Sequence, residues 1–317
     1  MIGALLSFAL LLGPSSEQMV TIGERLINEG AYDQAIMTFK RAAQMSEEPC
    51  APCERGMARA HLGAQRFPEA VQHMRTTIEL EGGTRSEVDT ILLARALMRT
   101  PGDELRPKRI GELISLLTPL AEKDDIGAMT LLADTFGRGS QDELAQQWAK
   151  KALALDPPDH FRWRLEMLRD RPYCGRERCL PNVQLTQLDQ STIESDSWVG
   201  RVVVLDFWAT WCTPCIDSLP DLERLKARFE EQPFELVSIS VDSDRSALDR
   251  VLDKHQLDWT QTWDPEGGLS RRRFGVQQFP TYLIVDQRGV IRTRFVGFTP
   301  NLEQRLASEV ARLLTQR

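Results

Sequence analysis

The stretch that decides the fold of the C-terminal half is VVVLDFWATWCTPC, residues 202–215. Its first seven residues, 202–208, form a β-prone run of the kind that is buried on both faces of a sheet. Two cysteines, Cys212 and Cys215, follow at once, and residues 213–232 then have the apolar spacing of a helix. The sequence therefore predicts a strand, a Cys-x-x-Cys pair and a helix in direct succession.

The start of a helix gives this pair of cysteines a chemical role. Unpaired N–H groups and the helix macrodipole stabilise a thiolate in the first turn. Cys212 is therefore predicted to attack a partner, and Cys215, one turn further, to resolve the mixed disulfide. Thr213 and Pro214 lie between them and are expected to adjust the thiol pKa and to contact the substrate. This placement favours a redox centre over a metal site or a structural staple.

Strands and helices alternate in the rest of this half. The further predicted strands are 234–242, 281–286 and 290–297, and the further predicted helices are 245–256, 267–276 and 301–314. This order requires a right-handed crossover and a central sheet with helices on both faces. The predicted class is therefore α/β.

Three motifs in this order resemble the thioredoxin superfamily. Residues 202–215 resemble its active-site strand and helix, and Phe279-Pro280-Thr281 stands where the family carries a cis-proline loop. DQRGVIRTRFVG, residues 286–297, resembles a hairpin of the TlpA/ResA-type branch of exported thiol–disulfide oxidoreductases. The resemblance covers residues 182–317 and implies a thioredoxin-like domain whose only redox group is the Cys212–Cys215 disulfide, without a further cofactor.

The resemblance also implies how a substrate is held. A cis Pro280 closes the substrate groove and keeps a metal from the cysteine pair. Thr281 and the backbone before Pro280 pair with an extended partner chain, in the manner of strand addition. Phe279 and Trp211 are expected to line the same groove, with Trp211 beside the disulfide.

A buried acid completes the site that the resemblance implies. Asp206 stands where thioredoxins hold a carboxyl whose pKa is raised by desolvation, and there it takes the proton from Cys215. Two positions depart from the family. Ser218 replaces a glutamate that the branch often has, and Ser238 stands where thioredoxins pair the acid with a lysine. Both departures affect the proton-transfer network.

The N-terminal half contains a repeat. Residues 29–45 recur as 63–80 and again as 141–159, each after another amphipathic segment, and residues 84–122 fit a diverged fourth copy. The repeats resemble the tetratricopeptide repeat, a helix–turn–helix unit. The matching positions in the first copy are Gly30, Tyr32, Ala35, Phe39 and Ala42. We therefore predict a helical repeat domain over 17–170, which serves as a platform for partner binding or dimerisation. The alternative is a passive spacer or a domain that stabilises its neighbour.

The six cysteines form three close pairs. Even pairing in an exported chain favours disulfides. Cys174 and Cys179 lie in a predicted linker, 171–181, and are expected to form a structural disulfide. Cys50 and Cys53 are expected to form a local disulfide or to remain reduced, with a second redox site as the alternative. A zinc site built from these four cysteines is a weaker alternative, so no metal is predicted.

The first residues predict export. Residues 1–15 have an apolar core followed by Gly13-Pro14-Ser15, as a secretory signal has, and the apolar run is too short to span a bilayer. Because no Lys or Arg precedes this run, a buried N-terminal helix is the alternative. Export places the chain in the bacterial periplasm, without an integral membrane segment after cleavage. A net charge of −7 argues against binding to nucleic acid.

The function predicted from these features is an exported thiol–disulfide oxidoreductase. It is expected to exchange disulfides with protein partners, with reduction preferred over oxidation, to accept electrons from an unidentified redox donor, and to use its repeats for partner binding. One alternative is a repeat-based adaptor with a secondary redox role. The other is a peroxiredoxin-like peroxidase, whose P-x-x-x-T-x-x-C pattern is not matched here, because Thr210 is two residues before Cys212 and residue 205 is leucine.

Overall fold

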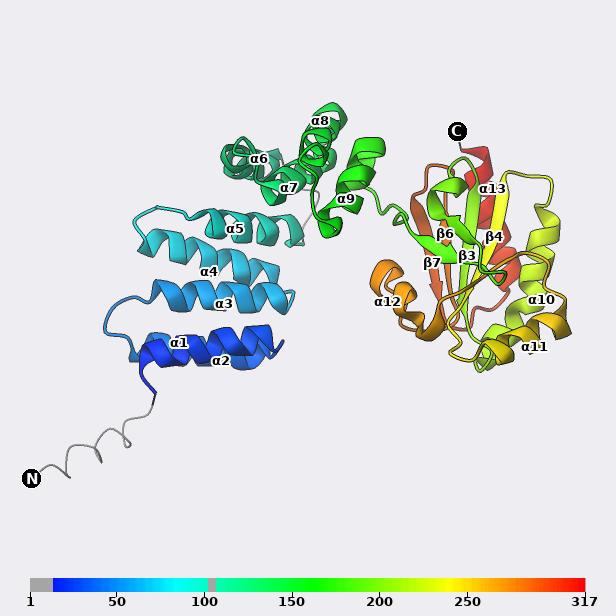
Figure 1. Cartoon of the computed structure of the whole chain (residues 1–317), viewed down its shortest axis with the longest axis horizontal. Coiled ribbons are helices and arrows are strands. Elements are labelled where there is room, and N and C mark those ends of the chain that lie inside the picture. The colour runs from blue at the N-terminus through cyan, green and yellow to red at the C-terminus, as the bar shows by residue number, and fades with distance from the viewer. Residues whose placement is uncertain (1–13, 102–106, 317) are drawn as a thin grey trace, which may run out of the picture. The chain divides into compact units, whose positions relative to one another are not determined.

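The computed structural model describes residues 14–101 and 107–316, so the predicted signal segment lies outside it except for Pro14 and Ser15. The chain forms two compact units that meet between Arg176 and Glu177 (Figure 1). This boundary falls inside the predicted linker. Within the described residues, no helix has the length and apolarity that a bilayer-spanning helix needs.

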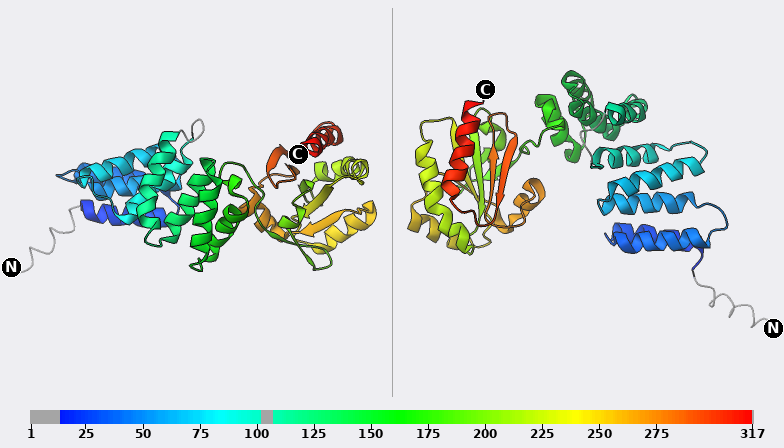
Figure 2. Two further views of the ribbon diagram at one scale, coloured as in Figure 1. Left: turned by 90° about the horizontal axis from the view of Figure 1, so that it is seen from above. Right: turned by 180° about the vertical axis from the view of Figure 1, so that it is seen from behind.

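The first unit is helical throughout its described residues. Its helices are α1 (Ser16–Asn28), α2 (Tyr32–Met45), α3 (Ala51–Gly63), α4 (Phe67–Leu80), α5 (Glu87–Arg99), α6 (Pro107–Ala121), α7 (Ile126–Arg138), α8 (Asp142–Leu153) and α9 (Asp159–Asp170). Each helix packs mainly against its neighbours in sequence (Figures 1 and 2). This nearest-neighbour packing is typical of a helical repeat, in which stacked units share one continuous core.

Small residues let the first helices approach closely. Phe39 of α2 is fully buried between Gly23 of α1 and Gly56 of α3. A Cβ atom at Gly56 would lie 2.3 Å from a carbon of the Phe39 ring, and one at Gly23 would lie 2.6 Å from it. Because real Cβ atoms do not approach so closely, both glycines are required by the packing of this ring.

The first residues of the predicted linker pack against the helical unit. Residues Pro172–Gly175 form a short 3₁₀ helix that packs against α7, with Gly175 in backbone contact with Gly137. A Cβ atom at Gly175 would lie 2.7 Å from the carbonyl carbon of Gly137. The helical unit therefore extends beyond residue 170, where the sequence placed its end.

The second unit is built on a mixed sheet with the order β5-β4-β3-β6-β7. The strands of this unit are β1 (Gln184–Thr186), β2 (Thr192–Glu194), β3 (Val202–Trp208), β4 (Phe234–Ser240), β5 (Thr260–Trp263), β6 (Thr281–Val285) and β7 (Ile291–Val296). Strands β3, β4 and β5 are parallel, whereas β6 is antiparallel to β3 and to β7. The β1–β2 hairpin forms a separate two-stranded sheet.

Helices and the hairpin cover the two faces of the large sheet. The helices of this unit are α10 (Thr213–Arg228), α11 (Arg245–His255), α12 (Gly268–Phe274) and α13 (Leu302–Thr315). Val202 and Val204 of β3 pack with residues of α10 and α13, whereas Val203, Leu205 and Phe207 pack with residues of α12 and the hairpin. This alternation follows from the two-residue period of a strand, and it confirms the predicted α/β class.

Strand β5 was not predicted. Its sequence, TQTW, has four residues and no alternation of apolar and polar side chains. It lies at the edge of the sheet, where it pairs with β4 and where Thr262 also forms a single bridge to Gln187. An edge strand of this kind is specified by its neighbour and not by its own hydrophobic pattern.

Candidate active site

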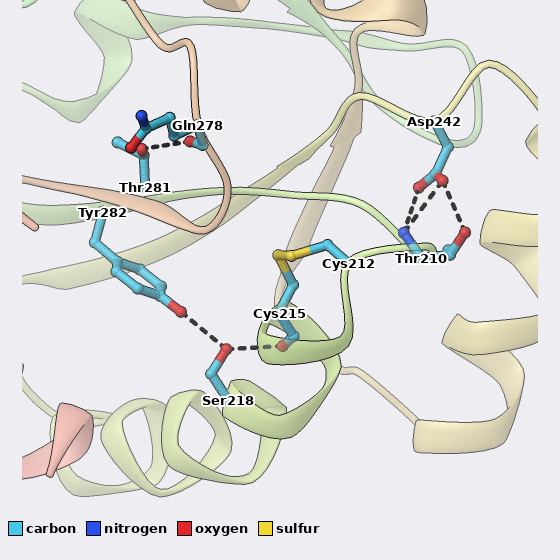
Figure 3. Close-up of a disulfide and its surroundings, with 8 residues drawn as sticks. All are labelled: Thr210, Cys212, Cys215, Ser218, Asp242, Gln278, Thr281 and Tyr282. Atoms are coloured by element: carbon cyan, nitrogen blue, oxygen red, sulfur yellow. Dashed lines mark hydrogen bonds between the residues drawn. A yellow bond between two sulfur atoms is a disulfide. The ribbon is translucent and has the colours of Figure 1, made fainter. Parts of the chain in front are cut away.

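The Cys212–Cys215 disulfide lies at the N-terminus of α10 (Figure 3). Cys212 is the N-cap residue, and its carbonyl oxygen accepts hydrogen bonds from the N–H groups of Cys215, at 2.9 Å, and of Ile216, at 3.1 Å. Both cysteines are buried, with Cys212 6% and Cys215 1% exposed. The pair therefore occupies the position that the sequence predicts, at the start of the helix after the buried strand β3.

The loop between β3 and the disulfide is tied to the next strand. Asp242, just beyond β4, accepts hydrogen bonds from the backbone N–H of Thr210, at 3.0 and 3.1 Å, and from its hydroxyl, at 2.7 Å (Figure 3). Ser240 donates a further hydrogen bond to this carboxylate at 2.8 Å. Sequence reasoning missed Asp242. The signal that could have found it is its place after β4, because neighbouring parallel strands end at the same edge of a sheet.

The proline loop lies on the other side of the disulfide. The Phe279–Pro280 peptide bond is cis. The Thr281 hydroxyl donates to the carbonyl of Gln278 at 2.7 Å, and the carbonyl of Pro280 accepts from the N–H of Gly297 at 2.7 Å. The Phe279 side chain packs against the apolar cluster that contains both active-site cysteines. These contacts hold the loop beside the cysteines, which is where the resemblance placed it.

Aromatic side chains surround the disulfide. Trp211 is 67% exposed, and its ring meets Phe279 edge-on, with 5.9 Å between the ring centres. Both rings line a cavity of about 510 Å³, whose wall also includes Arg271 and Glu266. Thr213, expected to contact substrate, is exposed. These side chains offer a partly apolar surface to an incoming chain.

A smaller cavity lies on the other side of the helix start. Its volume is about 40 Å³, and Pro214, Pro280 and Phe298 are among its lining residues. Phe298 is 74% exposed and was not singled out by the sequence reasoning. The cavity brings the proline between the two cysteines together with the cis proline.

The first turn of α10 is tied to strand β6. The Tyr282 hydroxyl donates to the Ser218 hydroxyl at 2.8 Å, and Ser218 donates to the carbonyl oxygen of Cys215 at 2.7 Å (Figure 3). Burial raises the pKa of the Tyr282 hydroxyl well above its ordinary range, so the group remains a donor. Ser218 thus holds the helix start at the position where the branch often has a glutamate.

Asp206 is buried in the sheet, with 1% of its surface exposed. Burial raises its pKa to about 7, although a hydrogen bond of 2.9 Å from the Ser238 hydroxyl favours the charged form. The indole N–H of Trp259 in turn donates to the Ser238 hydroxyl at 2.9 Å. The Ser238 hydroxyl is therefore the donor to this carboxyl, and Trp259, which donates to Ser238, is a residue that the sequence reasoning missed.

The other cysteines lie away from this site in the sequence. Cys50 and Cys53 form a disulfide at the start of α3, and Cys174 and Cys179 are also disulfide-bonded. Among the residues that the structure describes, no group of three or more His, Cys, Asp or Glu side chains is arranged to hold a metal ion.

Comparison with known proteins agrees with this geometry. The sequence profile of the Redoxin family matches residues 176–310, which is almost the whole of the second unit. The C-terminal unit belongs to the thioredoxin superfamily. Its superfamily relatives include the thiol-disulfide oxidoreductase ResA of Oceanobacillus iheyensis, with 31% identity over 115 residues. That match spans 35% of this chain but only 59% of the ResA protein.

Two further members of the thioredoxin superfamily are similar over more of their own length. The thioredoxin-like protein YneN of Bacillus subtilis has 28% identity over 159 residues, which cover 49% of this chain and 92% of YneN. A crystal structure of a thiol:disulfide interchange protein DsbE from Chlorobium tepidum has 27% identity and a TM-score of 0.41. It covers 44% of this chain and 96% of its own.

Proposed function

We propose that this protein is an exported thiol–disulfide oxidoreductase that reduces disulfides in partner proteins. The observation that carries the proposal is the Cys212–Cys215 disulfide at the start of α10, with the cis-proline loop beside it. Relatives of the second unit bear the name thiol-disulfide oxidoreductase. The disulfide is the redox group of the proposed reaction, which uses no other cofactor.

The proposed reaction starts from the reduced pair. The Cys212 thiolate attacks one sulfur of a substrate disulfide, forms a mixed disulfide and releases the other substrate sulfur as a thiolate. The Cys215 thiolate then attacks Cys212, which releases the second substrate sulfur and forms the Cys212–Cys215 disulfide. The substrate gains two electrons and two protons, and a dithiol donor later returns the pair to the reduced state.

The site supplies the groups that these steps need. Free N–H groups in the first turn of α10 stabilise the Cys212 thiolate. The proposed proton acceptor for Cys215 is Asp206, whose pKa of about 7 lets it exchange a proton near neutral pH. Its position in β3 places it on the face of the sheet that α10 covers, because Val202 and Val204 of the same parity pack there.

The substrate is proposed to bind as an extended chain across the cysteines. The backbone before Pro280 supplies the main-chain partners. Thr281 was expected to pair with the substrate as well, but it is already paired with β3 and β7 on its two sides. Trp211 and Phe279 supply apolar contacts beside the substrate cysteine. Because most of these contacts are to backbone or to aromatic rings, they favour protein substrates with a disulfide in an accessible loop.

Location and partners complete the proposal. Residues 1–15 are proposed to direct export to the bacterial periplasm, where disulfide chemistry of this kind takes place. The helical unit is proposed to act as a tetratricopeptide-like platform for a protein partner, since its helices pack in sequence order as repeats do. Fractionation of cells that express the chain, followed by N-terminal sequencing of the mature protein, tests the export step.

Insulin reduction tests the activity. With dithiothreitol as the donor, the purified protein should accelerate insulin precipitation, and Cys212→Ser should remove most of the acceleration because no mixed disulfide can form at the start of α10. The double variant Cys50→Ser/Cys53→Ser is the matched control, which removes a cysteine pair of the same spacing and should keep the activity. Undiminished insulin reduction by the Cys212→Ser protein would overturn the proposal.

The direction of the reaction needs its own measurement. The reduction potential of the Cys212/Cys215 pair can be measured by equilibration with redox buffers. A value near that of thioredoxin, about −270 mV, supports a reductase, whereas a value near that of DsbA, about −120 mV, means that the protein oxidises its partners.

A further inference from the structure

The sequence C-A-P-C, residues 50–53, begins α3 in the same way as C-T-P-C begins α10. In both helices the first cysteine is the N-cap, the proline follows within the first turn, and the second cysteine is three residues after the first. The N-cap backbone angles are φ −94° and ψ 89° at Cys50, and φ −91° and ψ 96° at Cys212. Two pairs in one chain therefore share one backbone conformation.

The hydrogen bonds of the two helix starts also correspond. The carbonyl oxygen of Cys50 accepts from the N–H groups of Cys53 and of Glu54, both at 3.1 Å. The carbonyl oxygen of Cys212 accepts from the equivalent N–H groups at 2.9 and 3.1 Å. The Cα atoms are 5.2 Å apart in both pairs. The backbone of the two helix starts therefore corresponds, whereas the sulfur of Cys50, unlike that of Cys212, also accepts an N–H hydrogen bond.

The two sulfurs of the α3 pair differ in their surroundings. Cys53 is fully buried in an apolar cluster with Met19 and Ala42, whereas Cys50 is half-buried at the edge of that cluster. The backbone N–H of Cys53 donates to the sulfur of Cys50 at 3.2 Å. An N–H donor at this sulfur stabilises its thiolate once the disulfide is reduced. Cys50 is therefore the more accessible cysteine of the pair.

A purely structural role explains this disulfide poorly. It closes a loop with only two residues between the cysteines, Ala51 and Pro52, so it removes little chain entropy from the unfolded state. The start of α3 is already held by the main-chain hydrogen bonds described above. The bond therefore adds little to what the helix itself provides.

We propose that Cys50–Cys53 is a second redox-active disulfide, which exchanges electrons with protein or small-molecule dithiols through Cys50. A thiolate of the dithiol attacks the Cys50 sulfur, and Cys53 leaves as a thiolate that takes up a proton. The second thiol of the donor then attacks the donor sulfur that is bonded to Cys50, which closes the donor disulfide and releases Cys50 as a thiolate. The donor becomes a disulfide, and the α3 pair gains two electrons and two protons.

Reduction of the folded protein tests this inference without changing the pair itself. The full-length chain with Cys212→Ser/Cys215→Ser is equilibrated with reduced and oxidised dithiothreitol, and thiols are trapped by alkylation and assigned by peptide mass spectrometry. Cys50 and Cys53 should titrate reversibly while circular dichroism stays unchanged, and should be reduced at least about tenfold faster than Cys174 and Cys179. A pair that is reduced only together with unfolding, or no faster than those two cysteines, would overturn the proposal.

Two single variants in the same background test which sulfur is attacked. Cys53→Ser leaves Cys50 as a thiol, and Cys50→Ser leaves Cys53. The thiol of Cys50 should react with Ellman's reagent at least about tenfold faster than that of Cys53, with the labelled peptide identified by mass spectrometry. Equal rates, or a faster Cys53, contradict the inference. Because neither test uses insulin reduction, a failure here is separate from a failure of the proposed function at Cys212.

Discussion

Asp206 is a carboxyl group enclosed by the sheet and held by one hydroxyl donor, Ser238. Its pKa rises from 3.8 to about 7, with burial as the main cause. A carboxyl in this range can take up and release a proton near neutral pH, which a surface aspartate cannot do. The same burial has a cost for stability, because the charged form is disfavoured in the folded state.

This cost predicts the effect of Asp206→Asn on stability. Between about pH 4 and pH 7 the folded chain keeps the proton and the unfolded chain releases it, so stability falls as the pH rises and levels off above pH 7. The difference between 3.8 and about 7 corresponds to about 4 kcal/mol. Asp206→Asn should therefore be more stable than the native chain at pH 8, by up to about 4 kcal/mol, and similar to it near pH 4.

Urea unfolding at pH 4.5 and pH 8, read out on the second unit by peptide-resolved hydrogen exchange, measures this effect. Asp253→Asn, which neutralises an exposed aspartate in α11, is the control and should leave the pH dependence unchanged. If Asp206→Asn keeps the pH dependence of the native chain, then burial of a charged Asp206 does not destabilise the protein.

Ser238 should set the pH at which the enzyme becomes active. Its hydrogen bond lowers the pKa of Asp206, so Ser238→Ala should raise that pKa and move the rising limb of insulin reduction to higher pH. The control is Ser270→Ala, since the buried Ser270 hydroxyl has no hydrogen-bond partner among the residues that the structure describes. A shift of the same size in both variants, or no shift in Ser238→Ala, would show that Asp206 does not control the profile.

At the scale of the elements, helix α10 is held in place at its start by residues from two other strands. Tyr282 of β6 reaches the first turn through Ser218, and Asp242 after β4 holds the loop that leads to it. Each tie is a buried or half-buried hydrogen bond, which contributes about 1 kcal/mol and fixes orientation. Hydrogen bonds from the strands of the sheet therefore fix the position of the active-site disulfide.

The stability of the helical unit depends on the close approach of its helices. Alanine substitutions at two glycines test this dependence. Gly56→Ala would place a Cβ 2.3 Å from the Phe39 ring, so it should destabilise the helical unit by about 1–3 kcal/mol. Gly111→Ala in α6 is the matched control, because no atom of residues 14–101 or 107–316 lies within 4 Å of its added Cβ. That change should be neutral or stabilise by up to about 1 kcal/mol. Thermal unfolding by circular dichroism distinguishes them, and equal effects would refute the packing argument.

At the scale of the whole molecule, the two units have separate hydrophobic cores. The clusters of the first unit contain only residues up to Leu168, and those of the second begin at Leu180. The active-site cysteines, the proline loop and Asp206 all belong to the second unit. The Cys212–Cys215 site and the proposed partner-binding helices therefore belong to different units.

This division predicts that the second unit works alone. A fragment of residues 177–317 with Cys179→Ala should fold cooperatively and reduce insulin within about twofold of the full chain. Circular dichroism and the insulin assay check both statements. A fragment that is unfolded, or that loses most of its activity while folded, would mean that the helical unit contributes to the chemistry.

The amino-acid sequence by itself determined the parts of this protein that depend on neighbours along the chain. Strand β3, the Cys212–Cys215 pair and helix α10 follow from local periodicity and from the chemistry of a helix N-terminus. Pairing of nearby helices in the first half follows in the same way from the repeat. The short edge strand β5 did not, because its order comes from pairing with β4 and from the bridge between Thr262 and Gln187.

Only the tertiary structure decided which side chains serve the cysteines. Thr210 and Asp242 are 32 residues apart, Ser238 and Trp259 are 21 apart, and Ser218 and Tyr282 are 64 apart. Each of these contacts depends on which strands are neighbours and on their register, and a single-residue slip would turn the side chains to the other face. The local sequence does not determine that register, so the polar groups around the site could be identified only from the folded structure.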